Sequence, residues 1–135
     1  MADSAPLRIL IIDDDEHVQK SLVFVLKMMG HEIFTADTAA QGVRTFAECR
    51  PDLIFVDMVM PGGHGVDAVH DIRALDASVY IVAMSGSDEG GLNNLLATAR
   101  AKGANESLGK PFDFKETERV LTEVTALSAQ QRRAG

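Results

Sequence analysis

The sequence predicts an α/β fold in which a parallel β-sheet carries helices on both faces. Short apolar segments of β-type composition alternate five times with longer segments whose apolar residues have helical spacing. Two of the short segments, Ile9 to Ile12 and Leu53 to Val56, are continuous apolar runs, as is typical of parallel strands buried on both sides. Because a right-handed crossover packs its helix back onto the sheet, this alternation indicates one layered α/β domain.

Five strands are expected, of which the first and third are the most apolar. The second contains His31 and Glu32 beside apolar residues, and this mixed composition indicates an edge strand. The fifth is short and only weakly apolar. In chain order, the expected strands are Arg8 to Ile12, Glu32 to Ala36, Leu53 to Val56, Tyr80 to Met84 and Glu106 to Leu108.

A helix is expected after each strand. The first has apolar residues at helical spacing from Val18 to Met29, with Gly30 as its expected C-cap. Gly103 is expected to end the fourth helix, and Pro111 precedes the fifth. The other expected helices are Thr38 to Cys49, Val66 to Leu75, Gly91 to Lys102 and Phe114 to Leu127.

The length of 135 residues fits one domain, because domains usually contain about 100 to 150 residues. We expect this domain to cover residues 7–127. Residues 1–6 are an expected N-terminal tail. Residues 128–135, which are rich in Ala, Gln and Arg, are an expected fraying C-terminal tail.

The composition argues against several classes of protein. Hydrophobic residues make up 46% and charged residues 24%, which is typical of a globular chain and not of a disordered one. The formal net charge of −7 disfavours nucleic acid as a partner, since binding to phosphates relies on cationic side chains. Apolar runs are too short for a membrane span. The single cysteine, Cys49, and the absence of a signal-like N-terminus favour the cytoplasm.

Polar residues follow four of the expected strands, at the sheet edge where open α/β folds bind ligands. These residues are Asp13-Asp14-Asp15, Asp57, Ser85 and Lys110. Carboxylates that share a small space repel one another unless a cation intervenes, and oxygen ligands suit Mg²⁺. A metal ion, a lysine and a hydroxyl around a carboxylate can together hold a phosphoryl group during its transfer. Asp57 is therefore a candidate nucleophile.

Four motifs carry a resemblance to a known family. The chain resembles the receiver domain of two-component response regulators from about Leu7 to Leu127, and the motifs occur in the family's order at the ends of successive strands. They are Ile11-Ile12-Asp13-Asp14-Asp15, Asp57-Met58-Val59-Met60-Pro61 followed by Gly65, Met84-Ser85-Gly86, and Lys110-Pro111-Phe112.

The resemblance implies a flavodoxin-like fold, a doubly wound five-stranded parallel sheet of order 2-1-3-4-5 with five helices. It implies that Asp57 accepts a phosphoryl group from a histidine kinase or a histidine phosphotransfer protein and then loses it slowly, with no other enzymatic activity. Ser85 and Lys110 would contact the phosphoryl oxygens. The implied Mg²⁺ ligands are the carboxylates of Asp13, Asp14 and Asp57 and the backbone carbonyl of Val59.

The sequence departs from the family in how a signal would leave this site. Ser85 stands where threonine is commoner, and Ser107 stands where many members have an aromatic residue that reports phosphorylation. Gly90 and Gly91 weaken the start of the fourth helix. Our hypothesis is that the segment Gly86 to Asn94 becomes ordered on phosphorylation. A partner protein would then bind the face formed by the fourth helix, the fifth strand and the fifth helix.

Two alternative functions remain open at this point. One is a small Mg²⁺-dependent phosphohydrolase of the haloacid dehalogenase type, because Asp13 and Asp15 have that family's Asp-x-Asp spacing. This alternative leaves the motif that begins at Asp57 unexplained. The other is a receiver fold that no longer switches and serves as a scaffold.

Overall fold

Five parallel strands form the centre of the molecule in the order β2-β1-β3-β4-β5. The computed structural model describes residues 6–60, 65–85, 92–110 and 113–134. The predicted strand order is confirmed, and β2 lies at an edge as its mixed composition indicated. The strands are β1 (Arg8–Ile12), β2 (Glu32–Ala36), β3 (Leu53–Asp57), β4 (Tyr80–Ser85) and β5 (Glu106–Gly109).

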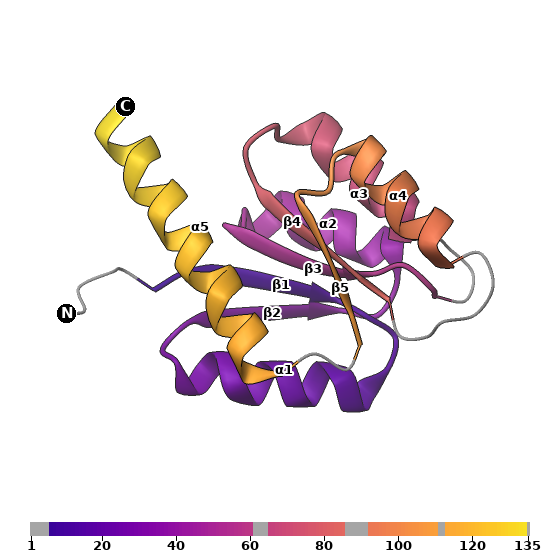
Figure 1. Ribbon diagram of the computed structural model, residues 1–135, viewed down its shortest axis with the longest axis horizontal. Coiled ribbons are helices and arrows are strands. Elements are labelled where there is room, and N and C mark those ends of the chain that lie inside the picture. Colours follow the sequence, from indigo (N-terminus) through magenta and orange to yellow (C-terminus); the bar gives the residue numbers. More distant parts are fainter. Residues whose placement is uncertain (1–5, 61–64, 86–91, 111–112, 135) are drawn as a thin grey trace.

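Helices cover both faces of this sheet, with α1 and α5 on one face and α2, α3 and α4 on the other (Figure 1). Alternate residues of β1 show the two layers: Ile9 and Ile11 pack with the residues of α1 and α5, whereas Leu10 and Ile12 pack with those of α2 and α3. The bounds are α1 (Glu16–Met28), α2 (Ala39–Cys49), α3 (Gly65–Leu75), α4 (Leu92–Lys102) and α5 (Phe114–Ala134).

The ends of the helices differ in places from the expected ones. Helix α1 has its C-cap at Met29, and Gly30 follows it with a φ of 93°, a left-handed conformation that favours glycine. Gly103 ends α4 with a φ of 127°, as expected from the sequence. Helix α5 continues to Ala134, so the segment expected to fray after Leu127 is helical through most of its length. Ala, Gln and Arg are good helix formers, which explains this continuation.

We expected the segment Gly86 to Asn94 to become ordered on phosphorylation. Its residues 86–91 lie outside the described part of the chain. Helix α4 starts at Leu92, one residue after its expected start. Among the helices of the described residues, none has the length and apolar character that a membrane span requires.

The guanidinium group of Arg73, at the end of α3, ties together three parts of the chain. It donates hydrogen bonds to the backbone carbonyl of Gly103 at 2.7 and 3.1 Å, just after α4. It also donates to the carbonyl of Val79 at 2.8 Å, just before β4, and to Asn105 Oδ1 at 2.9 Å. The planar guanidinium offers five N–H donors in a fixed geometry, so one side chain gives each of these acceptors a hydrogen-bond partner.

Candidate functional site

Two buried aspartates lie side by side at the carboxyl edge of the sheet. Asp57 is the last residue of β3, and Asp13 directly follows β1. These strands are hydrogen-bonded neighbours with Ile12 paired to Val56, so the next residue of each strand reaches the same place. The Asp13 backbone N–H donates to the Ala36 carbonyl at 3.1 Å, which extends the pairing of β1 with β2 past the strand end.

Asp14 completes a cluster of three carboxylates with Asp13 and Asp57. One oxygen from each residue lies within 4.8 Å of the others, and Asp14 is exposed whereas the other two are buried. Oxygen ligands this close together, with one open to solvent, fit a hard divalent cation such as Mg²⁺. Asp15 does not share the cluster. Its Oδ1 accepts the backbone N–H groups of His17 and Val18, so it caps α1.

The ammonium group of Lys110 faces the two buried carboxylates from beyond β5. Lys110 Nζ lies 3.0 Å from Asp13 Oδ2 and 3.6 Å from Asp57 Oδ2. Its backbone N–H donates to the Ser85 carbonyl, which fixes the lysine beside the end of β4. The lysine thereby compensates part of the negative charge that two buried carboxylates bring to one site.

Burial raises the pKa of the Asp57 carboxyl to about 6, and repulsion from the Asp13 carboxylate adds to this shift. A hydrogen bond from the backbone N–H of Val59 to Asp57 Oδ1, 3.1 Å long, opposes the rise, as does the charge of Lys110. The carboxyl is thus mostly ionised at neutral pH, yet its charge is costly to hold. A bound cation would relieve that cost.

The remaining predicted site residues come together at the same edge. Ser85 ends β4 and is buried, and its neighbour Met84 pairs with Asp57 across the sheet. Val59 lies two residues beyond β3, with an exposed side chain and its N–H turned back to Asp57. Ser107 is half-buried in β5 and pairs with Ala83, two positions before the end of each strand.

Gly65 has a role that its sequence motif did not explain. A Cβ atom at this position would lie 2.1 Å from the Asp57 carbonyl oxygen and 2.8 Å from Met58 Cε. Helix α3 therefore starts in direct contact with the backbone of Asp57, and only glycine permits so close an approach. A glycine eight residues after an aspartate carries no distinctive signal by itself.

Gln19 was missed entirely by the sequence analysis. Its side-chain amide donates to the backbone carbonyl of Asp13, and it also lies 3.2 Å from the Ala36 carbonyl and 3.0 Å from Asp37 Oδ1. The amide thus holds together the loop after β1, which begins with Asp13, and the loop after β2. A glutamine in the first turn of a helix has no sequence pattern that predicts such a contact.

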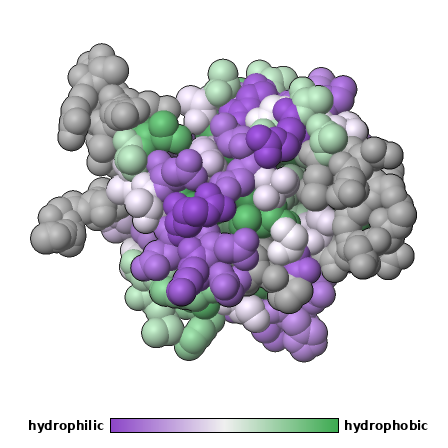
Figure 2. Space-filling view, in the orientation of Figure 1, coloured by the Kyte–Doolittle hydropathy of each residue, from purple (hydrophilic) through white to green (hydrophobic). Residues whose placement is uncertain are grey.

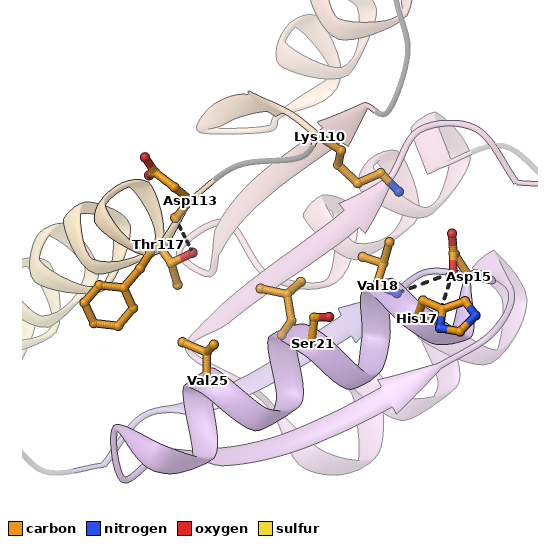
Figure 3. A pocket seen from close by; sticks show the side chains of 10 residues that line it. Asp15, His17, Val18, Ser21, Val25, Lys110, Asp113 and Thr117 are labelled. Carbon is orange, nitrogen blue, oxygen red and sulfur yellow. Dashed lines mark hydrogen bonds between the residues drawn. The ribbon is translucent and has the colours of Figure 1, made fainter.

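A groove of about 500 Å³ opens beside Lys110, between α1 and the start of α5. Figure 3 shows Val18, Ser21 and Val25 on one wall, Asp113 and Thr117 on the other, and Lys110 with Asp15 toward one end. Lys110 also contacts Asp13 and Asp57.

Residues 9–122 match the family model of the response regulator receiver domain. The chain belongs to this family. It is 36% identical over 129 residues to the transcriptional regulatory protein PrrA of Mycobacterium tuberculosis, and the match covers 95% of this chain and 51% of PrrA. It is 35% identical over 133 residues to the DNA-binding transcriptional regulator NtrC of Azospirillum brasilense, with 94% of this chain and 27% of NtrC covered.

Receiver domains of known structure share the fold. A receiver domain protein from Clostridium thermocellum has a TM-score of 0.83 and 27% identity, and the match covers 93% of this chain and 98% of that one. A CheY-like receiver from Methanospirillum hungatei has a TM-score of 0.84 at 21% identity, with 97% and 100% covered, and this likeness concerns the fold alone. The predicted family, the predicted fold and the function of a response regulator receiver are confirmed.

The relatives qualify one expectation from the sequence. Several are named as DNA-binding regulators, which does not match the expected absence of a nucleic-acid partner. This chain spans about half the length of PrrA and a quarter of NtrC, so these names describe longer proteins. Nothing among the comparisons favours the phosphohydrolase alternative, and the capping role of Asp15 leaves it without its second aspartate.

Proposed function

We propose that Asp57 is the phosphoacceptor of this receiver domain. The observation that carries the proposal is the surroundings of its carboxylate: the Val59 N–H lies at 3.1 Å, the Lys110 ammonium at 3.6 Å, and oxygens of Asp13 and Asp14 within 4.8 Å. The ionised Asp57 oxygen attacks the phosphorus of a phosphohistidine, and the P–N bond breaks with its electron pair leaving on the imidazole. A pKa of about 6 keeps this nucleophile available at neutral pH.

The proposal assigns Mg²⁺ to the three-carboxylate cluster, with the Val59 backbone carbonyl as a further ligand. The support is the donor chemistry, three oxygens within 4.8 Å, together with the raised pKa of Asp57. When bound, the ion supplies positive charge for the phosphoryl oxygens in the transition state. Asp13 and Asp14 hold it in place, and Lys110 supplies the second positive charge.

Ser85 and Lys110 bind the phosphoryl oxygens once Asp57 is phosphorylated. Both lie at the carboxyl edge of the sheet beside Asp57, and the hydrogen bond from the Lys110 N–H to the Ser85 carbonyl keeps them together. A hydroxyl donor and an ammonium group match the negative oxygens of an acyl phosphate. Slow hydrolysis of the acyl phosphate then resets the domain.

The phosphodonor is a histidine kinase or a histidine phosphotransfer protein in the cytoplasm. The groove between α1 and α5 supports its approach to Lys110, which contacts Asp57. The lone, buried Cys49 supports a reducing compartment. The downstream partner is a protein that contacts the face of α4, β5 and α5. In this proposal the chain itself contacts no nucleic acid, in keeping with its net charge of −7.

A small-molecule donor tests the acceptor assignment. Incubation with acetyl phosphate and Mg²⁺ should add one acid-labile phosphoryl group, observed by intact mass, to the wild-type protein and to Asp71→Asn, a control at an exposed aspartate. Asp57→Asn should gain none, and Asp14→Ala should react far more slowly. Undiminished labelling of Asp57→Asn would reject the assignment, and turnover of a generic phosphate ester would favour the phosphohydrolase.

Labelling without switching would favour the scaffold alternative. Hydrogen exchange with and without beryllofluoride separates the two, because a switching receiver should gain protection in the chain from Gly86 to Asn94 while α1 and α2 change little. Equal protection in both states would contradict the ordering hypothesis.

A further inference from the structure

Two large apolar side chains of α1 face solvent on the side of the helix away from α5. Phe24 is 66% exposed and Met28 is 72% exposed, and their spacing of four residues places them on one helix face. Figure 2 shows a green area at the lower left of the molecule, where α1 lies in Figure 1.

These side chains border a groove of about 700 Å³ that runs between α1 and the edge strand. The rest of its lining consists of the β2 residues Ile33 and Thr35 and of four further α1 residues, Gln19, Lys20, Val23 and Lys27. Because β2 is the last strand on this side of the sheet, the groove lies open beside the edge. It is separate from the groove that leads to Lys110, which lies on the α5 side of the same helix.

The charges of this groove are opposite in sign to the charge of the whole chain. Lys20 and Lys27 are the charged residues among those that line it, although the chain has a net charge of −7. They are separated by seven residues, which is two helical turns and about 10 Å along α1. The groove therefore has an apolar surface that is flanked by the two lysines.

We propose that this groove binds an acidic amphipathic helix of a partner protein. A helix lying along α1 would place apolar side chains against Phe24, Met28 and Ile33. Two carboxylates seven residues apart on that helix would match the spacing of Lys20 and Lys27. This surface is independent of the proposed phosphodonor and of the α4-β5-α5 face.

Charge and shape disfavour two other occupants. A second copy related by a two-fold axis would bring Lys20 and Lys27 against the same lysines of its partner. A membrane with anionic lipids would attract the two lysines but repel a chain of net charge −7, and a flat bilayer would leave the groove unfilled.

A designed peptide tests the proposal directly. The probe is a labelled helical peptide with leucines along one face and two flanking glutamates seven residues apart, compared with a scrambled peptide by fluorescence anisotropy. The wild-type domain should bind the designed peptide at least about tenfold more tightly than the scrambled one. Phe24→Ala with Met28→Ala should abolish this preference. Leu75→Ala, at a 50% exposed leucine at the end of α3, is the matched control and should retain it.

A charge reversal identifies the electrostatic part. The Lys20→Glu with Lys27→Glu variant should no longer bind the glutamate peptide and should instead bind a peptide with lysines at the same two positions. Phosphorylation by acetyl phosphate and the thermal melt should be unchanged in every variant, since these side chains are exposed. Equal binding of designed and scrambled peptides, or indifference to the charge reversal, overturns the proposal. The proposal is also overturned if the wild-type domain self-associates, or binds phosphatidylglycerol vesicles, and the Phe24→Ala with Met28→Ala variant does not.

Discussion

Lys110 Nζ donates a hydrogen bond of 3.0 Å to Asp13 Oδ2, joining residues that are 97 positions apart in the chain. The same nitrogen is 3.6 Å from Asp57 Oδ2. The lysine therefore pairs more closely with a proposed metal ligand than with the proposed phosphoacceptor. A cation that binds Asp13 must compete with this ion pair.

The first prediction concerns Lys110→Met. Without the lysine, Asp13 is free to bind a cation and one repelling positive charge is lost, so Mg²⁺ affinity above neutral pH should rise several-fold. The same change should raise the pKa of Asp57, because the lysine charge lowers it. Titration calorimetry and ¹³C NMR of the aspartate carboxyls measure the two effects. Lys115→Met, at an exposed lysine of α5, should change neither. Weaker Mg²⁺ binding in Lys110→Met would contradict the competition.

The second prediction concerns the stability of the metal-free domain as a function of pH. The pKa of Asp57 is about 6 in the folded state and about 3.8 in the unfolded chain, so folding favours the neutral carboxyl. The contribution of Asp57 to the free energy of unfolding should fall as pH rises from about 4 to about 6, and the loss should be complete above that range.

Asp57→Asn should therefore be more stable than the wild type at neutral pH without metal, and the difference should vanish near pH 4. Urea denaturation across this range measures it, with Asp71→Asn as the control at an exposed carboxyl. Saturating Mg²⁺ should remove most of this difference, since ligand at a hundredfold excess over its Kd adds about 2.7 kcal/mol to a protein that binds it. A difference that does not depend on pH would exclude ionisation of Asp57 as its cause.

The third prediction concerns Gly65→Ala. The added methyl group would lie 2.1 Å from the Asp57 carbonyl oxygen, and a backbone atom cannot move aside as a side-chain tip can. We expect a loss of about 1 to 3 kcal/mol in the free energy of unfolding and slower phosphorylation, because α3 or the Asp57 backbone must shift. Gly109→Ala is the control, since a Cβ there meets nothing within 4 Å. Equal stability of the two variants would show that the contact is not tight.

The fourth prediction concerns Gln19→Ala. Loss of the amide that binds the Asp13 carbonyl should loosen the loop that presents Asp13 and Asp14, and Mg²⁺ affinity should fall by about tenfold. Gln41→Ala, which removes the acceptor of the Asp37 N–H in the next loop, is the control and should bind Mg²⁺ normally. A lower melting temperature with unchanged Mg²⁺ affinity would assign Gln19 a structural role alone.

The sequence pattern was sufficient for the layered parallel sheet and for the residues that meet at its edge, whereas the strand order was implied by the resemblance to the receiver family. Strand-end aspartates such as Asp13 and Asp57 become neighbours through topology alone, so pattern and chain order predict their meeting. The contacts of Gln19 and Gly65 could not be predicted, because they depend on side-chain direction and helix position to within an ångström. The continuation of α5 was missed because residues 128–134 lack the apolar periodicity by which its earlier turns were recognised.

The contacts of Arg73 limit how α4 can move. This side chain holds the Gly103 carbonyl and Asn105 to α3, and a Cβ at Gly103 would lie 2.8 Å from Arg73 Cγ, so the far end of α4 is a fixed pivot. Helix α4 is 11 residues long and so forms a lever of about 16 Å. A tilt of about 10° about this fixed end would displace the first residue of α4 by about 3 Å. The N-terminal end of α4 can therefore shift while the residues after its C-terminal end stay bound to Arg73.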